Sequence, residues 1–399
     1  MIASATKATR AQTKSHNKTL IFKTIYDHGQ ISRADVARVT HLTRPTVSST
    51  VVELIEEGLV AEVGQGPSEG GKPPILLSVV EDSRHLIGID LANSEFRGAV
   101  IDLRGKIIHR CGLPVDERDG EAALQLVYQL VDELTAAATS PILGIGIGTP
   151  GLMNPEAGVV RKAVNLDWQD LPLRDLLAER YRLPVYIAND SQVAALGEFT
   201  FGCSRQLSSL VVVKVGRGIG AGIVIDGQLF YGDGNGAGEI GHIRVVENGE
   251  VCRCGNTGCL ETVVSSRLLI SQAKEIMQRN PQSLLHQFAA APAEVNTSVI
   301  LQAFAAGDPD VRQAVATMGR YLGIAVANLV GILNIKQIAI GGSLARFEAG
   351  LVEPVRQEMH RHVQPTQANE TTVVVANLGT DILIFGAAAL LLANELGLV

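Results

Sequence analysis

The sequence predicts an α/β protein in which a small helical head precedes a larger, glycine-rich body. At 399 residues the chain is longer than one hydrophobic core usually grows, so we expect two or three domains. Aromatic residues make up only 4% of it, and Ala, Val, Leu, Ile and 41 glycines must fill the interior, which suits α/β architecture. Residues 1–50 carry eight Lys and Arg against two Asp, a net charge of +6, whereas the whole chain carries −7.

The composition also indicates where the chain resides. It has no uninterrupted run of about 18 apolar residues, so we expect no transmembrane span. Residues 1–18 are polar and lack the apolar segment of a secretory signal. Five cysteines, three of them within eight residues, do not resemble the disulfide framework of a secreted protein. We therefore expect a cytoplasmic protein with reduced thiols and no membrane partner.

Residues 17–58 predict three short helices. The first carries apolar residues at helical spacing and ends at Gly29. Ser32 is the expected N-cap of the second helix and Thr43 that of the third, and only a tight turn separates these two helices. This spacing is typical of a helix-turn-helix.

Two apolar runs, 59–63 and 75–79, predict strands on either side of a glycine-rich wing, so we assign a winged helix-turn-helix to residues 1–80. The basic charge of this head and the small polar groups of its third helix predict binding to operator DNA. The residues expected to contact DNA are Ser32, Arg33, Arg44, Thr46, Ser48, Ser49 and Lys72, and Thr50 is expected to point outward with them. A packing module with a solvated polar face is the alternative.

Behind the head, apolar strands that end in glycine-rich turns recur twice, with helices between them. This repetition predicts two related α/β halves that face a cleft. The expected strands are a hairpin over 85–110 that turns at Arg104-Gly105, and runs at 142–151, 183–187, 209–230 and 337–342. The expected helices lie at 119–138, within 265–331, and from Gly386 onward.

Two features of the body have more than one interpretation. The run GRGIGAG at 216–222 follows a strand, where its backbone N–H groups could approach a phosphate, but glycines equally form tight hairpins. Asp190 follows another strand and is a candidate general base for a hydroxyl group, although it could simply cap the next helix.

A cysteine cluster in the body predicts a structural zinc site. His242, Cys252, Cys254 and Cys259 have the spacing H-x9-C-x-C-x4-C, and one imidazole with three thiolates forms a closed tetrahedral ligand set. Inert buried thiols do not need two glycines between them, and a disulfide is not expected in a reducing compartment. The spacing also differs from that of a DNA-reading zinc finger.

These motifs, in this order, resemble the ROK family of repressors, open reading frames and sugar kinases. The most specific segment is GAGEIGHIRVVENGEVCRCGNTGCLE at 236–261. It is supported by GTPG at 148–151, VNLDW at 164–168, AND at 188–190 and IGGSLA at 340–345. The resemblance covers essentially the whole chain, and the winged head is similar to that of the repressor branch.

The resemblance implies a fold and a ligand. The body is expected to be a two-lobed, actin-like or ribonuclease H-like α/β fold, with a first lobe at 84–195 plus 380–399 and a second lobe at 196–379 that holds the zinc. A sugar or sugar-phosphate effector is expected in the cleft, and His242 would bind it with the ring nitrogen that does not hold zinc. The implied sugar-binding residues are Asn165, Asn189, Asp190, Glu239, His242 and Glu261.

One departure from the family pattern bears on activity. Kinases of the family resemble DxGGT in the first phosphate loop, whereas this chain has Ala92 and Asn93 at the glycine positions, and Arg217 replaces a small hydroxyl residue in the second loop. We therefore expect a sugar-responsive repressor without catalytic residues, acting as a homodimer or tetramer on operator DNA. The alternative is an active ATP-dependent sugar kinase with an accessory DNA-binding head, in which Asp190 is the base.

Overall fold

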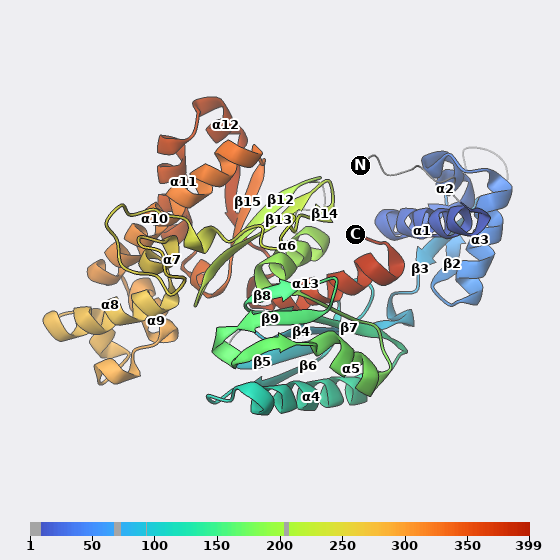
Figure 1. The fold of residues 1–399 in the computed structure, drawn as a ribbon. Helices are drawn as coiled ribbons and strands as arrows, with labels where there is room; N and C mark the ends of the chain where they lie inside the picture. Colours follow the sequence, from blue (N-terminus) through green and yellow to red (C-terminus); the bar gives the residue numbers. More distant parts are fainter. Residues whose placement is uncertain (1–8, 68–72, 93, 203–206) are drawn as a thin grey trace.

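The head consists of three helices and a small sheet. The computed structural model describes residues 9–67, 73–92, 94–202 and 207–399 (Figure 1). The head helices are α1 (Arg10–His28), α2 (Arg33–Thr40) and α3 (Arg44–Glu56). The strands β1 (Ile31–Ser32), β2 (Val60–Gln65) and β3 (Ile75–Val79) form a sheet of order β1-β3-β2. This is the expected winged helix-turn-helix architecture.

The expected N-caps are confirmed. The Ser32 hydroxyl accepts a hydrogen bond from the Asp35 backbone N–H, and Thr43 accepts one from that of Thr46. Helix α1 begins earlier than expected, because Thr9 and Gln12 form a capping box ahead of a polar first turn that has no apolar periodicity.

The first half of the body is a five-stranded sheet. Its order is β11-β7-β4-β5-β6, with α4 (Gly120–Ala137) and α5 (Leu173–Tyr181) as connections. The strands are β4 (His85–Asp90), β5 (Glu95–Ile101), β6 (Ile107–Pro114), β7 (Ile142–Thr149) and β11 (Val185–Asn189). Residues 85–110 were expected to form one hairpin, but they form a three-stranded meander. A second turn, after Asp90, separates β4 from β5. This half also contains a small sheet that was not expected, formed by β8 (Leu152–Asn154), β9 (Val159–Ala163) and β10 (Trp168–Leu171).

The second half repeats the topology of the first. Its order is β14-β13-β12-β15-β16, and in both sheets a three-stranded antiparallel meander is extended by two parallel strands. The strands are β12 (Leu210–Val215), β13 (Ile219–Ile225), β14 (Gln228–Leu229), β15 (Gln337–Gly341) and β16 (Thr372–Val375). The helices are α7 (Leu260–Val263), α8 (Ser266–Arg279), α9 (Thr297–Ala306), α10 (Pro309–Leu333), α11 (Ala349–His362) and α12 (Pro365–Glu370). The expected pair of related α/β halves is confirmed.

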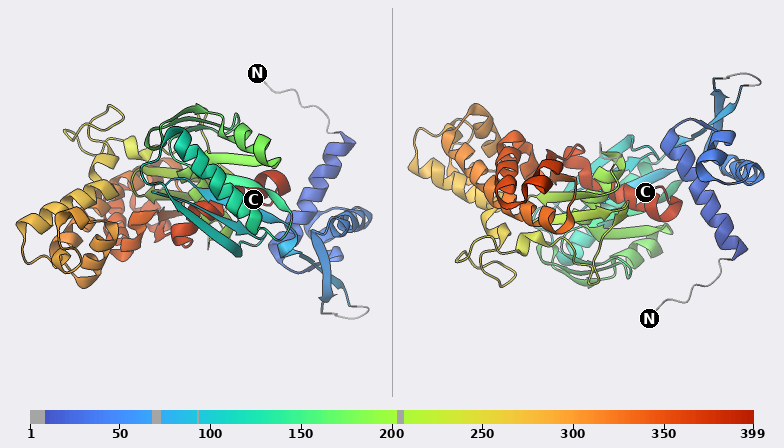
Figure 2. Two further views of the ribbon diagram at one scale, coloured as in Figure 1. Left: turned by 90° about the horizontal axis from the view of Figure 1, so that it is seen from below. Right: turned by 90° about the horizontal axis from the view of Figure 1, so that it is seen from above.

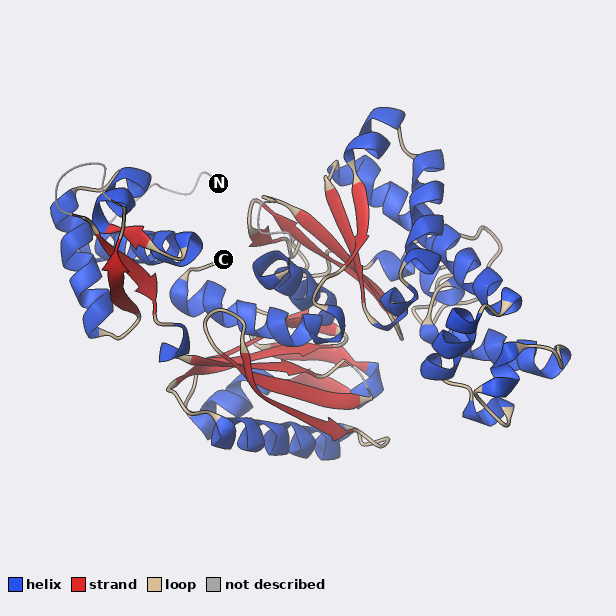
Figure 3. Ribbon diagram, turned by 180° about the vertical axis from the view of Figure 1, so that it is seen from behind, coloured by secondary structure: helices blue, strands red, loops and turns tan. Residues whose placement is uncertain are grey.

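The two halves exchange their last helices. Helix α6 (Asp190–Phe201) follows the first sheet but packs on β12 and β13 of the second. Helix α13 (Ile382–Leu391) follows the second sheet but packs on β4 and β7 of the first, and the two helices contact each other between the sheets (Figure 3). Helix α13 starts four residues before the expected Gly386 and ends in a π-helical turn, Leu392–Leu396.

Glycines allow the close approach of these elements. A Cβ atom on Gly146 of β7 would lie 1.8 Å from the carbonyl oxygen of Ala387 in α13. A Cβ atom on Gly386 would lie 1.8 Å from the carbonyl oxygen of Val193 in α6. Neither position accepts a side chain without displacing a helix, so these glycines are required for packing.

The head shares a hydrophobic core with the first half. Residues of α1, such as Ile25, belong to the same buried cluster as β4, β5 and the end of the chain at Leu398. The Tyr26 hydroxyl donates to the Leu103 carbonyl at 2.8 Å, and the Lys23 ammonium donates to the Leu398 carbonyl at 3.3 Å. The head therefore lies against the C-terminus, at the opposite end of the molecule from α8 and α9 (Figure 2).

The continuity of helix α6 bears on the expected lobe limits. The limit between residues 195 and 196 falls inside α6. Because α6 packs on the second sheet as a whole, we propose that the second lobe begins at the start of this helix.

Two long apolar segments lie within the body. Helix α10 and the segment Gly379–Leu396 are long and apolar enough to cross a membrane by length and composition. In each, 56% of the most apolar window is buried inside the protein, as in the core helices of globular domains. Their composition is therefore only weak evidence for a membrane span.

The packing of α13 gives a stability prediction. Gly146→Ala places a methyl group against the α13 backbone, and overpacking of this kind costs about 1–3 kcal/mol. We expect its thermal unfolding midpoint to fall by about 1 °C for each kcal/mol lost, because the entropy of unfolding grows with chain length. Gly331→Ala in α10 is the matched control, because nothing lies within 4 Å of its added Cβ, and it should keep or raise the midpoint. An unchanged midpoint for Gly146→Ala would contradict the close packing.

Candidate functional site

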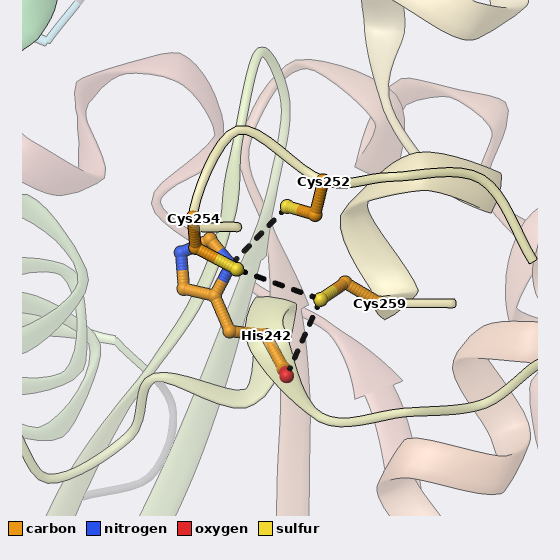
Figure 4. Close-up of side chains that lie close together, drawn as sticks. All are labelled: His242, Cys252, Cys254 and Cys259. Carbon is orange, nitrogen blue, oxygen red and sulfur yellow. Dashed lines mark hydrogen bonds between the residues drawn. The ribbon is translucent and has the colours of Figure 1, made fainter. Parts of the chain in front are cut away.

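The four residues of the expected metal site converge. His242 ends the 3₁₀ turn Ile240–His242, and the cysteines lie on the loop that follows it. One ligand atom from each residue can be chosen so that all four lie within 4.8 Å of one another (Figure 4). The Cys252 Sγ lies 3.6 Å from His242 Nδ1, and the Cys254 and Cys259 sulfurs are 3.7 Å apart. This cluster could hold a metal ion.

The local backbone explains why these sulfurs meet. The Cys252 N–H donates to the Asn256 carbonyl at 2.7 Å, which folds the cysteine loop into a tight turn. Gly255 and Gly258 adopt positive φ angles of 94° and 72°, which favour glycine. Burial raises the pKa of the Cys259 thiol, so binding of a dication there would release a proton.

Next to this cluster, four expected sugar-binding residues lie near one another. Burial raises the pKa of the Glu239 carboxyl. His242 lowers this pKa, whereas the nearby charges of Asp190 and Glu261 raise it, so all four side chains are close enough to interact. His242 Nε2 lies 3.9 Å from a Glu239 carboxylate oxygen, while its Nδ1 faces the cysteines. The two ring nitrogens therefore face different groups.

Asp190 is paired with a lysine that sequence reasoning missed. Its Oδ2 accepts a hydrogen bond from the Lys214 ammonium at 2.6 Å, and the two side chains are only 11% and 13% exposed. Asp190 is not the N-cap of α6, as the alternative interpretation had it. That residue is Asn189, whose Oδ1 accepts from the Ser191 N–H at 2.9 Å and whose Nδ2 donates to the Gly151 carbonyl at 3.0 Å.

The second glycine run is a hairpin turn. It connects β12 to β13, and Glu261 accepts a hydrogen bond from the Ile219 N–H at 3.2 Å. Gly222 allows close packing of α6, because a Cβ atom there would lie 2.1 Å from the Ser191 carbonyl oxygen. The hairpin interpretation is thus confirmed, whereas phosphate binding stays a hypothesis.

An arginine pairs with the aspartate at the start of the first loop. Asp90 is fully buried, and its carboxylate accepts from the Ala92 N–H at 2.9 Å and from the Arg97 guanidinium at 2.6 Å. Arg97 also donates to the Thr380 carbonyl at 2.8 Å, just before α13. Asn93, the other replaced glycine position, lies outside the described residues.

Asn165 lines a cavity that none of those four expected sugar-binding residues lines. It is exposed on the 3₁₀ turn Val164–Leu166, and its side-chain oxygen accepts from Arg267 at 3.3 Å. With Arg217 of the second half, it lines a cavity of about 550 Å³. The first half contributes Ala92 and Ser94 to the same cavity, so residues of both halves line it.

The head exposes most of the expected DNA-contacting residues. Arg44, Ser48 and Ser49 of α3 are exposed, and Thr46 is partly so. Arg33 is ion-paired with Glu62 of the wing at 2.8 Å.

Two expectations for the head need correction, and one cannot be assessed. Thr50 is only 5% exposed, because it shares the inward face of α3 with Val47 and Val51. Ser32 is only 3% exposed and its hydroxyl is bonded to Asp35, so we remove it from the DNA-contacting set. Lys72 lies outside the described residues.

A signal for the missed lysine was present in the sequence. Lys214 interrupts the apolar strand VVVKV, where an isolated charge needs a partner. Arg97 and Arg267 gave no such signal, because both lie in mixed segments that would equally suit solvent-exposed arginines.

Breaking the Asp190–Lys214 pair should leave a buried charge without its partner. Lys214→Met is expected to lower the free energy of unfolding by about 3 kcal/mol. Adding Asp190→Asn should recover part of that loss, because the unpaired carboxylate is then gone. Urea unfolding of both single variants and the double variant measures the coupling, and strictly additive losses would argue against the pair.

Comparisons with known proteins identify relatives that share this architecture. The sequence pattern described as the ROK family matches residues 86–394. The xylose repressor of Caldicellulosiruptor bescii is 36% identical over 388 residues, which cover 96% of this chain and 97% of that repressor.

Two solved structures extend the comparison. A ROK family transcriptional regulator, described as a homologue of E. coli Mlc, has a TM-score of 0.84 at 29% identity, covering 97% of this chain and 98% of its own. The ROK glucokinase of Streptomyces griseus, solved with glucose and AMPPNP, has a TM-score of 0.70 at 28% identity. The match covers 77% of this chain and 98% of the glucokinase chain.

Proposed function

The chain belongs to the ROK family, and on this premise we propose that it is a cytoplasmic, sugar-responsive transcriptional repressor. The observation that carries the proposal is coverage: the regulator structure matches 97% of the chain, whereas the kinase matches 77%. The family pattern itself begins at residue 86, after the winged head. The head is thus the part that distinguishes this chain from a kinase.

The cleft supports sugar binding. Carboxylates and amides are bidentate partners for neighbouring hydroxyls, and Asp190, Glu239, Glu261 and His242 lie close together there. We propose these four residues, with Asn189 and Asn165, as the effector site. Because both Asn189 and Asp190 belong to the start of α6, an effector bound there contacts a helix that packs on both α13 and the second sheet.

We propose that the chain has lost kinase activity. A general base must accept a proton, but Lys214 already neutralises Asp190. In the first loop, Arg97 similarly neutralises Asp90 at the place where the kinases of the family have a glycine-rich phosphate loop. Turnover of ATP and magnesium with a hexose panel, abolished by Asp190→Asn, would instead support the kinase alternative.

We propose that the cysteine cluster holds a structural zinc ion. Ideal tetrahedral zinc with Zn–S near 2.3 Å and Zn–N near 2.0–2.1 Å requires S–S and S–N edges of about 3.8 and 3.6 Å. The Cys254–Cys259 separation of 3.7 Å and the Cys252–His242 separation of 3.6 Å fit two of the six edges, and all four ligand atoms lie within 4.8 Å of one another. Bound zinc would fix the His242 ring so that Nε2 faces the cleft.

We propose that α13 connects the effector to DNA. It contacts α6 at the cleft, and the segment after it contacts α1 of the head through Leu398. An effector that favours one arrangement of the two halves changes the placement of the head, and so weakens operator binding. A homodimer or tetramer on a two-fold operator would place two such heads in neighbouring grooves.

The DNA-binding proposal is tested by Arg44→Ala. Its exposed guanidinium has no ion pair with another described residue, so its loss should raise the operator Kd about tenfold without changing sugar affinity. Fluorescence anisotropy at one fixed salt concentration provides the measurement. Arg161→Ala on the body also removes an exposed arginine, one paired with Asp170, and should have no effect on operator binding. An unchanged operator Kd for Arg44→Ala would exclude α3 as the recognition helix.

The zinc proposal is tested by Cys254→Ser. We expect metal content to fall from about one zinc per chain to background, because a closed site needs all four ligands. Sugar should then no longer release the operator, while operator binding without sugar is retained. Cys111→Ser, outside the cluster, is the control and should keep both properties. Full zinc content in Cys254→Ser, measured by atomic emission, would refute the site.

A further inference from the structure

A short turn of the first half lies between the head and the end of helix α6. Residues 102–106 connect β5 to β6, and on one side they are hydrogen-bonded to Tyr26 in the last turn of α1. On the other side the turn faces Phe201, the last residue of α6. The turn therefore contacts both the head and the helix whose start carries Asp190 of the proposed effector site.

The arginine of this turn binds the head in two ways. The Arg104 guanidinium donates a hydrogen bond to the Tyr26 carbonyl at 2.7 Å. Its Cζ atom also lies 4.2 Å from the centroid of the Tyr26 ring, within the range of a cation–π interaction. A carboxylate oxygen of Glu81 lies farther away, 3.8 Å from the Arg104 Nε. One guanidinium thus contacts both the backbone and the ring of a single head residue.

The Tyr26 side chain makes a further contact with the same turn. Its hydroxyl donates to the Leu103 carbonyl at 2.8 Å, and both residues are buried. The Leu103 N–H donates to the Glu81 carbonyl at 3.0 Å, in the segment that connects the head to the body. The two backbone polar groups of Leu103 therefore join the turn to the head and to its linker.

The conformation of the turn is fixed by an internal carboxylate. Asp102 is only 3% exposed, and its Oδ1 accepts hydrogen bonds from the Arg104 N–H at 2.8 Å and the Lys106 N–H at 2.9 Å. The Gly105 N–H donates to the Asp102 carbonyl at 3.2 Å. Bonds of this kind hold a turn in one conformation. A displacement on one side of the turn is therefore passed to the other side.

The end of α6 lies directly on this turn. Gly105 has a φ angle of 91°, and a Cβ atom there would lie 2.7 Å from the Phe201 ring. The ring thus contacts the backbone of the turn, with no room for a side chain between them. The Phe201 ring also packs against Phe385 of α13, with 5.4 Å between the ring centroids. Phe201 is therefore placed between α13 and the turn.

We propose that the turn at 102–106 is a second connection between the effector site and the head, in which Arg104 and Tyr26 are positioning residues. An effector that displaces α6 moves Phe201, and the turn then moves the last turn of α1. This inference rests on the proposed function and names a contact through which its regulation acts. It adds to the segment after α13, which reaches the head at Leu398.

Operator binding by the full-length protein, with and without sugar, tests the proposal. The probes are xylose, glucose, glucose 6-phosphate, N-acetylglucosamine and N-acetylglucosamine 6-phosphate, and the readout is the ratio of the operator Kd with a probe to that without it. Arg104→Gln should bring this ratio closer to one by about two- to thirtyfold, the range known for residues that couple distant sites. The Kd of the probe for the free protein should not change, because Arg104 contacts the head.

Further variants separate coupling from structural support. Tyr26→Phe keeps the ring under the guanidinium and loses only the bond to Leu103, so it should reduce the ratio less than Arg104→Gln does. Arg104→Lys keeps a cation and should restore part of the ratio. Phe201→Leu removes the ring that contacts the turn and should also bring the ratio closer to one. Lys106→Gln, an exposed charge of the same turn, is the matched control and should keep the full ratio.

Three results would overturn the inference: an unchanged ratio in Arg104→Gln, an unchanged ratio in Phe201→Leu, or an equal loss in Lys106→Gln. A lower thermal unfolding midpoint of Arg104→Gln with the ratio intact would show structural support alone. The unmodified protein distinguishes these failures from that of the proposed function. If a probe releases the operator equally from it and from Arg104→Gln, only the second connection is refuted. If no probe alters operator binding by the unmodified protein, both proposals fail.

Discussion

The exchange of α6 and α13 between the two halves is the packing constraint on which the other features depend. The two helices touch where Gly386 faces the backbone of Val193, with no room for a side chain. Asn189 and Asp190 of the proposed effector site lie at the start of α6, and the segment that follows α13 ends in the core of the head at Leu398. One pair of helices thus connects the proposed effector site to the DNA-binding surface.

On the proposal that kinase activity is lost, two ion pairs separate this protein from the sugar kinases of its family. Lys214 is ion-paired with Asp190, the candidate base of the kinase alternative, and Arg97 is ion-paired with Asp90 of the first loop. The remaining acids, Glu239 and Glu261, stay available for hydroxyl groups, and His242 lies between them and the cysteine cluster. On this account, a kinase-like cleft keeps its sugar-recognition groups while ion pairs replace its catalytic ones.

Local chemistry made much of this architecture predictable. The caps at Ser32 and Thr43 follow from hydroxyl chemistry at helix starts, and the metal cluster follows from cysteine spacing alone. The two related halves could be inferred because strands and glycine turns repeat along the chain. These features depend on residues that are close in sequence, so the spacing of residue types is enough to predict them.

Features that depend on distant partners could not be predicted in this way. Thr50 is a small polar residue like its exposed neighbours in α3, so its residue type does not distinguish it from them. It is buried because of the direction in which α3 packs. The partner of Lys214 lies 24 residues away on another element. The return of α13 to the first half was expected only from the family resemblance, because its apolar sequence does not encode that crossing locally.

The most direct test of the central claim is the affinity of the effector for the free protein and for the protein bound to operator DNA. Coupling between two sites is reciprocal, so each ligand must change the affinity of the other by the same factor. The account predicts that bound operator lowers the affinity for the effector, and that bound effector lowers the affinity for the operator by the same factor. Equal effector affinity in the free and operator-bound states would contradict it.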